Sequence, residues 1–524
     1  MSAKMSTPSV IGMAVSPVVA QPSTPPNKRR TSPSAEVSSS KQTLVLTSPS
    51  RRPPNVSLGV EFSLQPFFPP RQLFPRGVAK VAHQYTHAHP SAESREEKRA
   101  IWQNRHVLLP FNLRDSNLAI SGSDVHRLLH NIFPGTTNVT EGRYRSHLLF
   151  QVKELPSSPW PLTIGGVPIT IIDESGRGRP LMFPWQNLGN LNISICRASY
   201  GDVRVLSDTV LRKLAADVNA EFQKNLPSVR IIELMFTCER TFYVVVDDHI
   251  QIGAIRGSLP GRIANCPVGY LNNNELHRPL WADLPAKRQV EPQPKMGIID
   301  STAYDILRPG VMICSKLLKE NSHPAVFSTT SGVLVQNAAG DNFMTGASHG
   351  IGDQGTVWQA NRSDKIIGKA VAEISFTDVS LLELGKDVRF VNATFENSSG
   401  VTPNWSRLVN SDDILDWPIC YLNSPYTGNM EGIIVMKSVK LEASTHPTQD
   451  KLRYVVYNWS FMGQQEDNDG RAQPPDGTCG SVIWDDDGVI LGFYHYYIAE
   501  GRWAGFSPSV SASEVVEAGY TLAE

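Results

Sequence analysis

The chain has 524 residues, too many for one compact core, which predicts two or three domains besides any tails. It holds 49 basic and 50 acidic residues, so no global field favours nucleic acid or an anionic membrane, and we expect neither as a partner. The six cysteines are far apart with no C-x-x-C, which argues against a zinc ribbon or a disulfide framework and favours a reducing compartment.

Residues 1–56 are crowded with Ser, Pro and Thr and hold no aromatic side chains. Such a segment cannot bury enough apolar surface to offset the entropy of ordering, so we predict a disordered tail. Its cluster Lys28–Arg30 could act as a nuclear address, although a short basic cluster in a tail is usually solvated charge. The apolar run Val10–Val15 is followed at once by Ser16 and Pro17, which disfavours a secretion signal. We expect a cytoplasmic or nuclear protein rather than a secreted one.

Residues 57–285 have a globular composition and predict an α+β domain of unknown function. Apolar residues recur at helical spacing over 123–133 and 208–223. Short β-branched and aromatic runs predict strands over 147–153, 167–172, 229–236 and 241–246. His126 and His130 share a face of the first helix, but no acidic third ligand is nearby, so a solvated face is favoured over a metal site. We expect neither a metal nor another cofactor.

A segment rich in proline and charge, residues 286–297, predicts a linker. The remaining residues, 298–524, contain nine short β-branched and aromatic runs separated by turn residues. These runs are 330–335, 342–347, 355–359, 369–374, 388–395, 432–441, 453–462, 480–484 and 489–497. The pattern indicates an antiparallel barrel or sandwich rather than alternating strands and helices.

Three stretches of this last region carry residues suited to catalysis. Cys479 stands in Gly477–Gly480, where glycine lets the backbone amides of Gly477 and Cys479 point together at a developing oxyanion. Upstream, Thr345–His349 ends in a histidine and Asp378–Leu384 begins with an aspartate. A lone cysteine is more often a small buried hydrophobe, so the candidate site depends on all three stretches together.

These stretches resemble the motifs of chymotrypsin-like proteases. Thr345–His349 resembles their T-A-A-H, Asp378–Leu384 their D-I-A-L-L-x-L, and Gly477–Gly480 the G-x-C-G of the cysteine variants found in picornaviral-type proteases. The order His, Asp, Cys is also the order of the chymotrypsin triad. The resemblance covers residues 298–524 only. It implies a chymotrypsin-like double β-barrel of two six-stranded barrels, with the catalytic residues in the cleft between them.

The resemblance also implies a role for each residue. Cys479 would form a thioacyl enzyme, with His349 as base and then acid and Asp378 holding the imidazole ring. The amides of Gly477 and Cys479 would form the oxyanion hole. His495 resembles the histidine with which picornaviral-like proteases bind a glutamine or glutamate side chain. The competing interpretation is that His495 merely alternates with aromatic neighbours on a barrel strand.

Two positions depart from the family pattern. Gly350 and Thr478 stand where secreted members have a disulfide cysteine and an aspartate that receives the new N-terminus on activation. The resemblance therefore implies an intracellular cysteine endopeptidase with a protein or peptide substrate. Self-cleavage in the linker near residue 290 and the oligomeric state stay open. So do two other functions, an inactive protease-like module that binds protein, or a first domain that acts once the protease part releases it.

Overall fold

The computed structural model describes residues 106–109, 111–114, 120, 124–156, 160–178, 183–184, 187–200, 203–279, 298–317, 325–352, 354–363, 365–395, 402–441, 454–461 and 474–524. The predicted tail, residues 1–56, and the predicted linker, residues 286–297, lie outside these ranges. Within them, no helix combines the length and the apolar character that a membrane-crossing helix requires.

The first described part is a five-stranded sheet in the order β1-β4-β5-β3-β2 with one helix beside it. Its elements are β1 His106–Val107, α4 Asp124–His130, β2 Thr136–Glu141, β3 Leu148–Val152, β4 Thr163–Ile164 and β5 Val167–Asp173. The predicted helix over 123–133 and the predicted strands over 147–153 and 167–172 are confirmed as α4, β3 and β5. Phe133 and Phe150 meet edge to face in the core, with ring centroids 4.9 Å apart.

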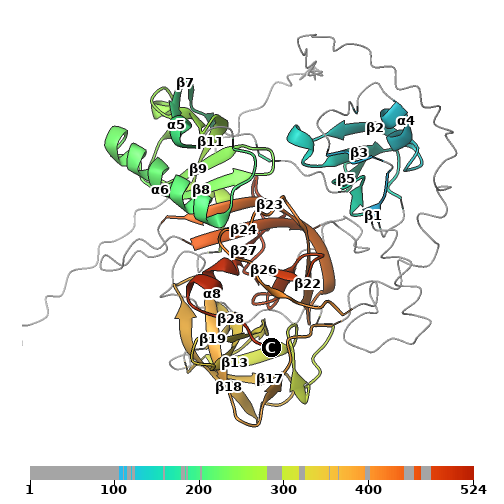
Figure 1. The fold of residues 1–524 in the computed structure, drawn as a ribbon, viewed down its shortest axis with the longest axis vertical. Helices are drawn as coiled ribbons and strands as arrows, with labels where there is room; N and C mark the ends of the chain where they lie inside the picture. Colours follow the sequence, from blue (N-terminus) through green and yellow to red (C-terminus); the bar gives the residue numbers. More distant parts are fainter. Residues whose placement is uncertain are drawn as a thin grey trace, which may run out of the picture. The chain divides into compact units, whose positions relative to one another are not determined.

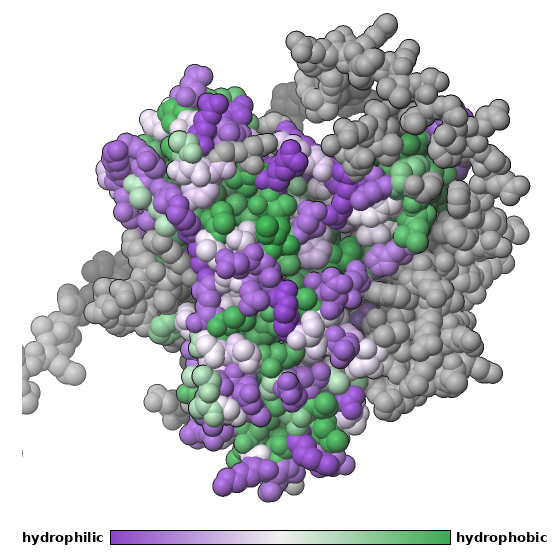
Figure 2. Space-filling view, viewed as in Figure 1, coloured by the Kyte–Doolittle hydropathy of each residue, from purple (hydrophilic) through white to green (hydrophobic). Residues whose placement is uncertain are grey.

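A second group of strands accompanies helix α6, Asp208–Asn225, with two strands before it in the chain and four after it. Helix α6 confirms the helix predicted over 208–223. The strands are β6 Asn187–Leu188, β7 Asn190–Ile195, β8 Ile231–Thr237, β9 Phe242–Val246, β10 Pro260–Ile263 and β11 Cys266–Asn272, with short helices α5 Arg197–Tyr200 and α7 Ile252–Ile255 between them. The Ser207 side chain caps α6 by accepting from the Val210 amide. One face of α6 is buried, whereas its outward face is mostly hydrophilic (Figure 2).

Six strands of the C-terminal region close into a barrel. They are β22 Ile419–Ser424, β23 Gly428–Lys440, β24 Tyr454–Phe461, β25 Val482–Trp484, β26 Val489–Tyr494 and β27 Phe506–Ser511. The order β22-β25-β26-β27-β24-β23 returns to its start because β23 also pairs with β22. The fold of this region is thus mostly β, as the sequence predicts.

The long strand β23 pairs with strands of both the barrel and the preceding group. Its first part pairs with β22 inside the barrel, and its last residues, Met436–Lys440, pair with β8. Strands β8, β9, β11, β10 and β7 therefore continue the same thirteen-stranded sheet, with β8 beside β23, β9 beside β8 and β11 beside β9 (Figure 1). The predicted parts 57–285 and 298–524 share this sheet, while their predicted boundaries stay predictions.

The remaining sheet has eight strands in the order β14-β13-β17-β18-β19-β16-β15-β28. They are β13 Met312–Leu317, β14 Ala325–Thr330, β15 Leu334–Gln336, β16 Asn342–Ala347, β17 Thr356–Gln359, β18 Ile366–Ile374, β19 Val379–Leu384 and β28 Thr521–Leu522. The chain passes from β14 directly into β15, where Gly332 donates to the Thr345 carbonyl and Thr345 donates to the Val333 carbonyl, each at 2.8 Å. The continuous segment formed by β14 and β15 thus pairs with β13 near one end of the sheet and with β16 near the other. The strand predicted over 388–395 is reduced to β20, Arg389–Phe390, which pairs with β12, Ile306–Leu307.

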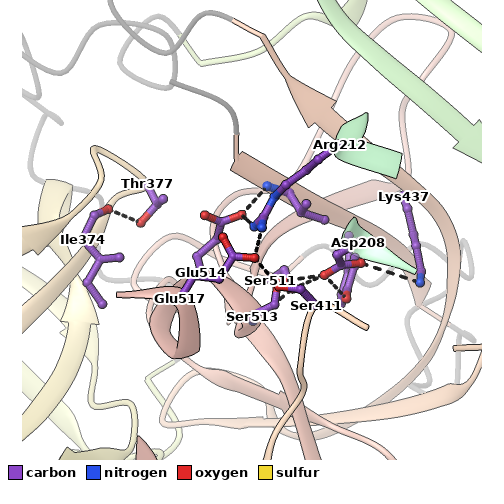
Figure 3. A network of polar contacts seen from close by, with 12 residues as sticks. Asp208, Arg212, Ile374, Thr377, Ser411, Lys437, Ser511, Ser513, Glu514 and Glu517 are labelled. Carbon is purple, nitrogen blue, oxygen red and sulfur yellow. Dashed lines mark hydrogen bonds and ion pairs between the residues drawn. The ribbon is translucent and has the colours of Figure 1, made fainter. Parts of the chain in front are cut away.

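Buried polar contacts join α6 to the barrel (Figure 3). The Asp208 carboxylate, in the first turn of α6, accepts from the hydroxyls of Tyr457 at 2.7 Å, Ser511 at 3.0 Å and Ser513 at 2.8 Å. The Lys437 ammonium lies 3.8 Å from the same carboxylate, and both side chains are 1% exposed. Because an uncompensated buried charge is costly, these contacts hold the helix and the barrel in one arrangement.

Candidate active site

The loop that carries Cys479 needs glycine at two positions. Gly477 has a φ of +93° and Gly480 a φ of +85°, which lie in the region that other residues rarely adopt. A Cβ at Gly477 would lie 2.4 Å from the Tyr426 ring, and one at Gly480 would lie 2.5 Å from the Thr330 carbonyl oxygen. The glycines of the G-x-C-G motif are therefore required both by backbone conformation and by close packing.

Strand β14 fixes this loop from the other sheet. The Cys479 carbonyl accepts from the Thr330 amide at 3.0 Å and from the Thr329 hydroxyl at 2.5 Å. The Thr330 hydroxyl donates to the Gly477 carbonyl at 2.7 Å. Neither threonine could be predicted from the sequence, because nothing in a Thr-Thr pair on a strand indicates which distant loop it will contact.

Gly350 leaves space beside Thr329. A Cβ at Gly350 would lie 2.7 Å from the Thr329 Cβ, closer than real Cβ atoms approach. The absence of a side chain at Gly350 thus makes room for the threonine that holds the Cys479 loop.

His349 and Asp378 meet across two neighbouring strands. His349 lies in the short helix η4, Ser348–Gly350, directly after β16, and Asp378 directly precedes β19, which pairs with β16. The His349 Nδ1 is 2.6 Å from Asp378 Oδ2, and the His349 amide donates to Asp378 Oδ1 at 2.9 Å. The carboxylate therefore holds both the ring and the backbone of His349.

The turn that presents Asp378 has an unusual backbone. Ser375, Phe376 and Asp378 have φ values of +44°, +56° and +75°, all in the left-handed region. Such conformations cost about 1–3 kcal/mol each in non-glycine residues and cluster at functional sites. The Asp378 amide is held by the Glu373 carboxylate at 3.0 Å, which stabilises the turn.

The Cys479 sulfur completes the group. A hydrogen bond joins the Cys479 and His349 side chains. Because Asp378 occupies Nδ1, the nitrogen that faces the sulfur is Nε2. The Thr329 hydroxyl also lies 3.2 Å from the sulfur. His349 and Cys479 are each 5% exposed and Asp378 is 6% exposed. The structure thus brings the three predicted residues together at the junction of the two sheets.

The electrostatics of this group favour an ion pair. Burial alone would lower the pKa of His349, but the charges of Asp378 and Cys479 and the hydrogen bonds to both outweigh burial and raise the pKa to about 10. Burial alone would raise the pKa of Asp378, but His349 and His495 hold that pKa well below its usual range. The ion pair that these shifts favour at neutral pH is a protonated His349 imidazole beside the charged Asp378 carboxylate.

The amides of Gly477 and Cys479 are available to a ligand. Among the described residues, neither amide donates a hydrogen bond to another group. The flanking amides are occupied, since Thr478 donates to the Pro475 carbonyl at 3.2 Å and Gly480 to the Tyr494 carbonyl at 2.9 Å. Two amides without an acceptor among the described residues fit the oxyanion hole that the sequence predicts, and this role stays a prediction.

His495 lies directly after β26 and is a second histidine beside Asp378. Its Nε2 is 3.1 Å from Asp378 Oδ2, and its ring centroid is 5.8 Å from that of His349. It is 5% exposed. The predicted substrate-binding role of His495 is untested and stays a prediction, but this geometry relates His495 to the carboxylate.

The ligand atoms of His349, Asp378 and His495 lie within 4.8 Å of one another, a spacing that could suit a metal ion. The histidine nitrogens, however, approach one carboxylate oxygen instead of surrounding an empty centre. Such an arrangement is suited to proton transfer more than to metal binding. His126 and His130, for which the sequence favours a solvated helix face over a metal site, have ring centroids 4.5 Å apart on α4.

Comparison with known proteins gives only distant likenesses. No family model and no curated protein matches the sequence. Among solved structures, a glutamic acid specific serine protease is 13% identical, with a TM-score of 0.28 over 41% of this chain and 100% of its own. Nocardiopsis protease is 15% identical, with a TM-score of 0.28 over 42% and 100% of the two chains. Cellulomonas bogoriensis chymotrypsin is 16% identical, with a TM-score of 0.26 over 37% and 90%. These values assign neither a family nor an activity to this chain.

Proposed function

We propose that this protein is a cysteine endopeptidase with a chymotrypsin-like double β-barrel, similar to the picornaviral-type proteases. One observation carries the proposal: the imidazole of His349 lies between the carboxylate of Asp378 and the thiol of Cys479. The closed barrel of β22–β27 supports the second barrel of this proposed pair. The direct passage from β14 to β15, which pair with opposite ends of the eight-stranded sheet, supports the first.

In the proposed reaction, His349 Nε2 takes the proton of Cys479 and the sulfur attacks the carbonyl carbon of a peptide. The carbonyl oxygen becomes an oxyanion that accepts hydrogen bonds from the amides of Gly477 and Cys479. His349 then gives its proton to the leaving amine, the C–N bond breaks and a thioacyl enzyme remains. Water, deprotonated by His349, attacks the thioester and releases the acid, and the proton returns to the thiol.

The test separates an activated thiol from an ordinary one. The full chain is treated with iodoacetamide at neutral pH, and the alkylation rate of each cysteine is followed by peptide mass spectrometry. We expect Cys479 to react at least tenfold faster than Cys314, whose pKa burial raises to about 11. His349→Ala should abolish the difference, whereas the control Cys314→Ala should leave the Cys479 rate unchanged. Equal rates at the two thiols in the wild type would contradict the proposal.

The alternative is an inactive protease-like module that binds protein. It is favoured by the low exposure of Cys479 and by the Thr329 hydroxyl on its sulfur, since both restrict access to the thiol. A peptide library incubated with the wild type and with Cys479→Ala decides between the two. Cleavage by the wild type alone supports the endopeptidase, and fast alkylation without any cleavage supports the binding module.

A further inference from the structure

The carboxylate of Asp378 is shared between two histidines. Oδ2 lies 2.6 Å from Nδ1 of His349 and 3.1 Å from Nε2 of His495, and all three side chains are buried. Oδ1 is occupied by the His349 amide. A buried carboxylate with two neighbouring imidazoles has more partners than are needed to orient one catalytic base, so the second imidazole requires an explanation.

The surroundings of His495 fix its position and its charge. Its amide donates to the Pro508 carbonyl at 3.1 Å, and its ring packs edge on against Tyr496 at 4.9 Å. His495 lines a small cavity together with Lys440 on β23, Glu233 and Arg278. Glu233 and Arg278 form a buried ion pair with each other. The charged or titratable groups around His495 are thus Asp378, His349, Lys440, Glu233 and Arg278. Burial is the main cause that lowers the pKa of His495, with further lowering from His349 and Lys440 against the opposing charge of Asp378.

We propose that His495 is a positioning residue, a neutral imidazole that carries its proton on Nε2, 3.1 Å from Asp378 Oδ2, and holds the carboxylate in place for His349. This inference rests on the proposed function. It gives His495 a role in the triad, whereas the sequence resemblance implies a role in substrate binding. In a neutral imidazole one ring nitrogen donates a hydrogen bond and the other accepts one. The tautomer of His495 therefore shows directly whether its Nε2 can donate to Asp378.

Sharing the carboxylate has a predictable effect on the base. A donor on Oδ2 disperses part of the negative charge that stabilises the His349 imidazolium. In His495→Leu, that donor is lost, so His349 should hold its proton more tightly. One neutral hydrogen bond corresponds to about half to one pH unit. His495→Gln places an amide N–H near the position of Nε2, and we expect it to restore most of the wild-type behaviour.

The experiment follows the alkylation rate of Cys479 in the full chain as a function of pH. The high-pH rise of the alkylation rate reflects the deprotonation of His349. In His495→Leu this rise should shift to higher pH by about half to one pH unit. His495→Gln should lie close to the wild type, and the control His147→Gln, at another buried histidine, should leave the profile unchanged. An unshifted rise in a folded His495→Leu protein overturns the inference, as does an equal shift in His147→Gln.

A second measurement needs no destabilising variant. In ¹⁵N-histidine NMR of the wild type, with His495→Gln used for assignment, His495 should show a protonated Nε2 and a neutral ring at neutral pH, because burial lowers its pKa. A protonated Nδ1 with a bare Nε2, or a doubly protonated ring at neutral pH, would overturn the inference. A wild-type Cys479 that reacts no faster than Cys314 would instead refute the proposed function, so the two failures are distinguishable.

Discussion

Replacing Asp378 with asparagine tests the centre of the proposed mechanism. The asparagine oxygen can still accept from the His349 amide, but its NH₂ group would donate to Nδ1, where the carboxylate accepts. The ring would then carry its proton on Nε2 and could not take one from Cys479. In the triad template, a wrong tautomer of this kind lowers turnover by about 10⁴.

The structure also gives the size of the electrostatic loss. The pKa of His349 rises from 6.5 to about 10, and Asp378 is the first of the causes that raise it. This difference corresponds to roughly 5 kcal/mol, so if half of it comes from Asp378, its loss lowers the imidazolium–thiolate population about a hundredfold. We therefore expect Asp378→Asn to alkylate at Cys479 about a hundredfold more slowly at neutral pH, with a larger loss in peptide cleavage.

The matched control is Glu373→Gln, which alters a carboxylate near the end of β18 that accepts from the Asp378 amide. It should change the alkylation rate by no more than a few fold. The reasoning would be refuted by an Asp378→Asn protein that is folded by circular dichroism and still reacts within threefold of the wild type, or by an equal loss in Glu373→Gln.

Three further outcomes follow from single contacts. Gly477→Ala forces a Cβ against the Tyr426 ring at a positive φ, so peptide cleavage should fall at least tenfold and the melting temperature should drop. An unchanged cleavage rate and melting temperature would show that the loop relaxes freely. Thr330→Val keeps the side-chain shape but leaves the Gly477 carbonyl without its hydroxyl donor, and we expect a loss of about 1–3 kcal/mol in urea unfolding, with no loss if solvent replaces the bond. Burial lowers the pKa of His147 from 6.5 to about 4, so the unfolded chain binds the proton more readily than the folded chain. The stability that depends on neutral His147 is fully present above pH 6.5 and falls by up to about 3 kcal/mol as the pH drops to 4. His147→Gln should remove this pH dependence of the free energy of unfolding.

The sequence motifs identified the residues that the structure brings together, although their catalytic roles stay predictions. His349, Asp378 and Cys479 could be found because each lies in a short phrase whose order and wording resemble one family. Thr329 and Thr330 could not, because their contact with the Cys479 loop spans about 150 residues and leaves no local pattern. Long-range contacts of this kind are set by strand register, which a single sequence does not reveal.

His495 illustrates the same limit at the level of one residue. Successive side chains on a strand point to opposite faces, so an error of one position exchanges the two faces. Tyr494 is the last residue of β26, and its amide bonds to the Ser481 carbonyl, while His495 follows it and lies against Asp378. A histidine near the end of a strand after the nucleophile was visible in the sequence, but the face it occupies was not.

The strand runs were predicted with similar success and similar gaps. β16 has the predicted bounds, and β17, β18, β23, β24 and β26 overlap their predicted runs. Strands β13, β19, β22 and β27 were missed. In β22, Ile419–Ser424, every residue is buried, so the polar and apolar alternation that marks a half-exposed strand is absent.

The pairing of β8 with β23 changes what a cut in the linker can do. A proteolytic site engineered into residues 286–297 would divide the chain between these strands, yet five residue pairs from Met436 to Lys440 and the buried Asp208 contacts would still hold the two pieces together. We therefore expect the cut protein to elute as one species in gel filtration and to separate only in denaturant, with Asp208→Asn separating at a lower denaturant concentration because Lys437 loses its buried partner. Separation of the unmodified pieces in native buffer would show that the sheet does not hold the two parts. Since the upstream strands stay with the barrel, cleavage near residue 290 would not by itself free the first part of the chain to act elsewhere.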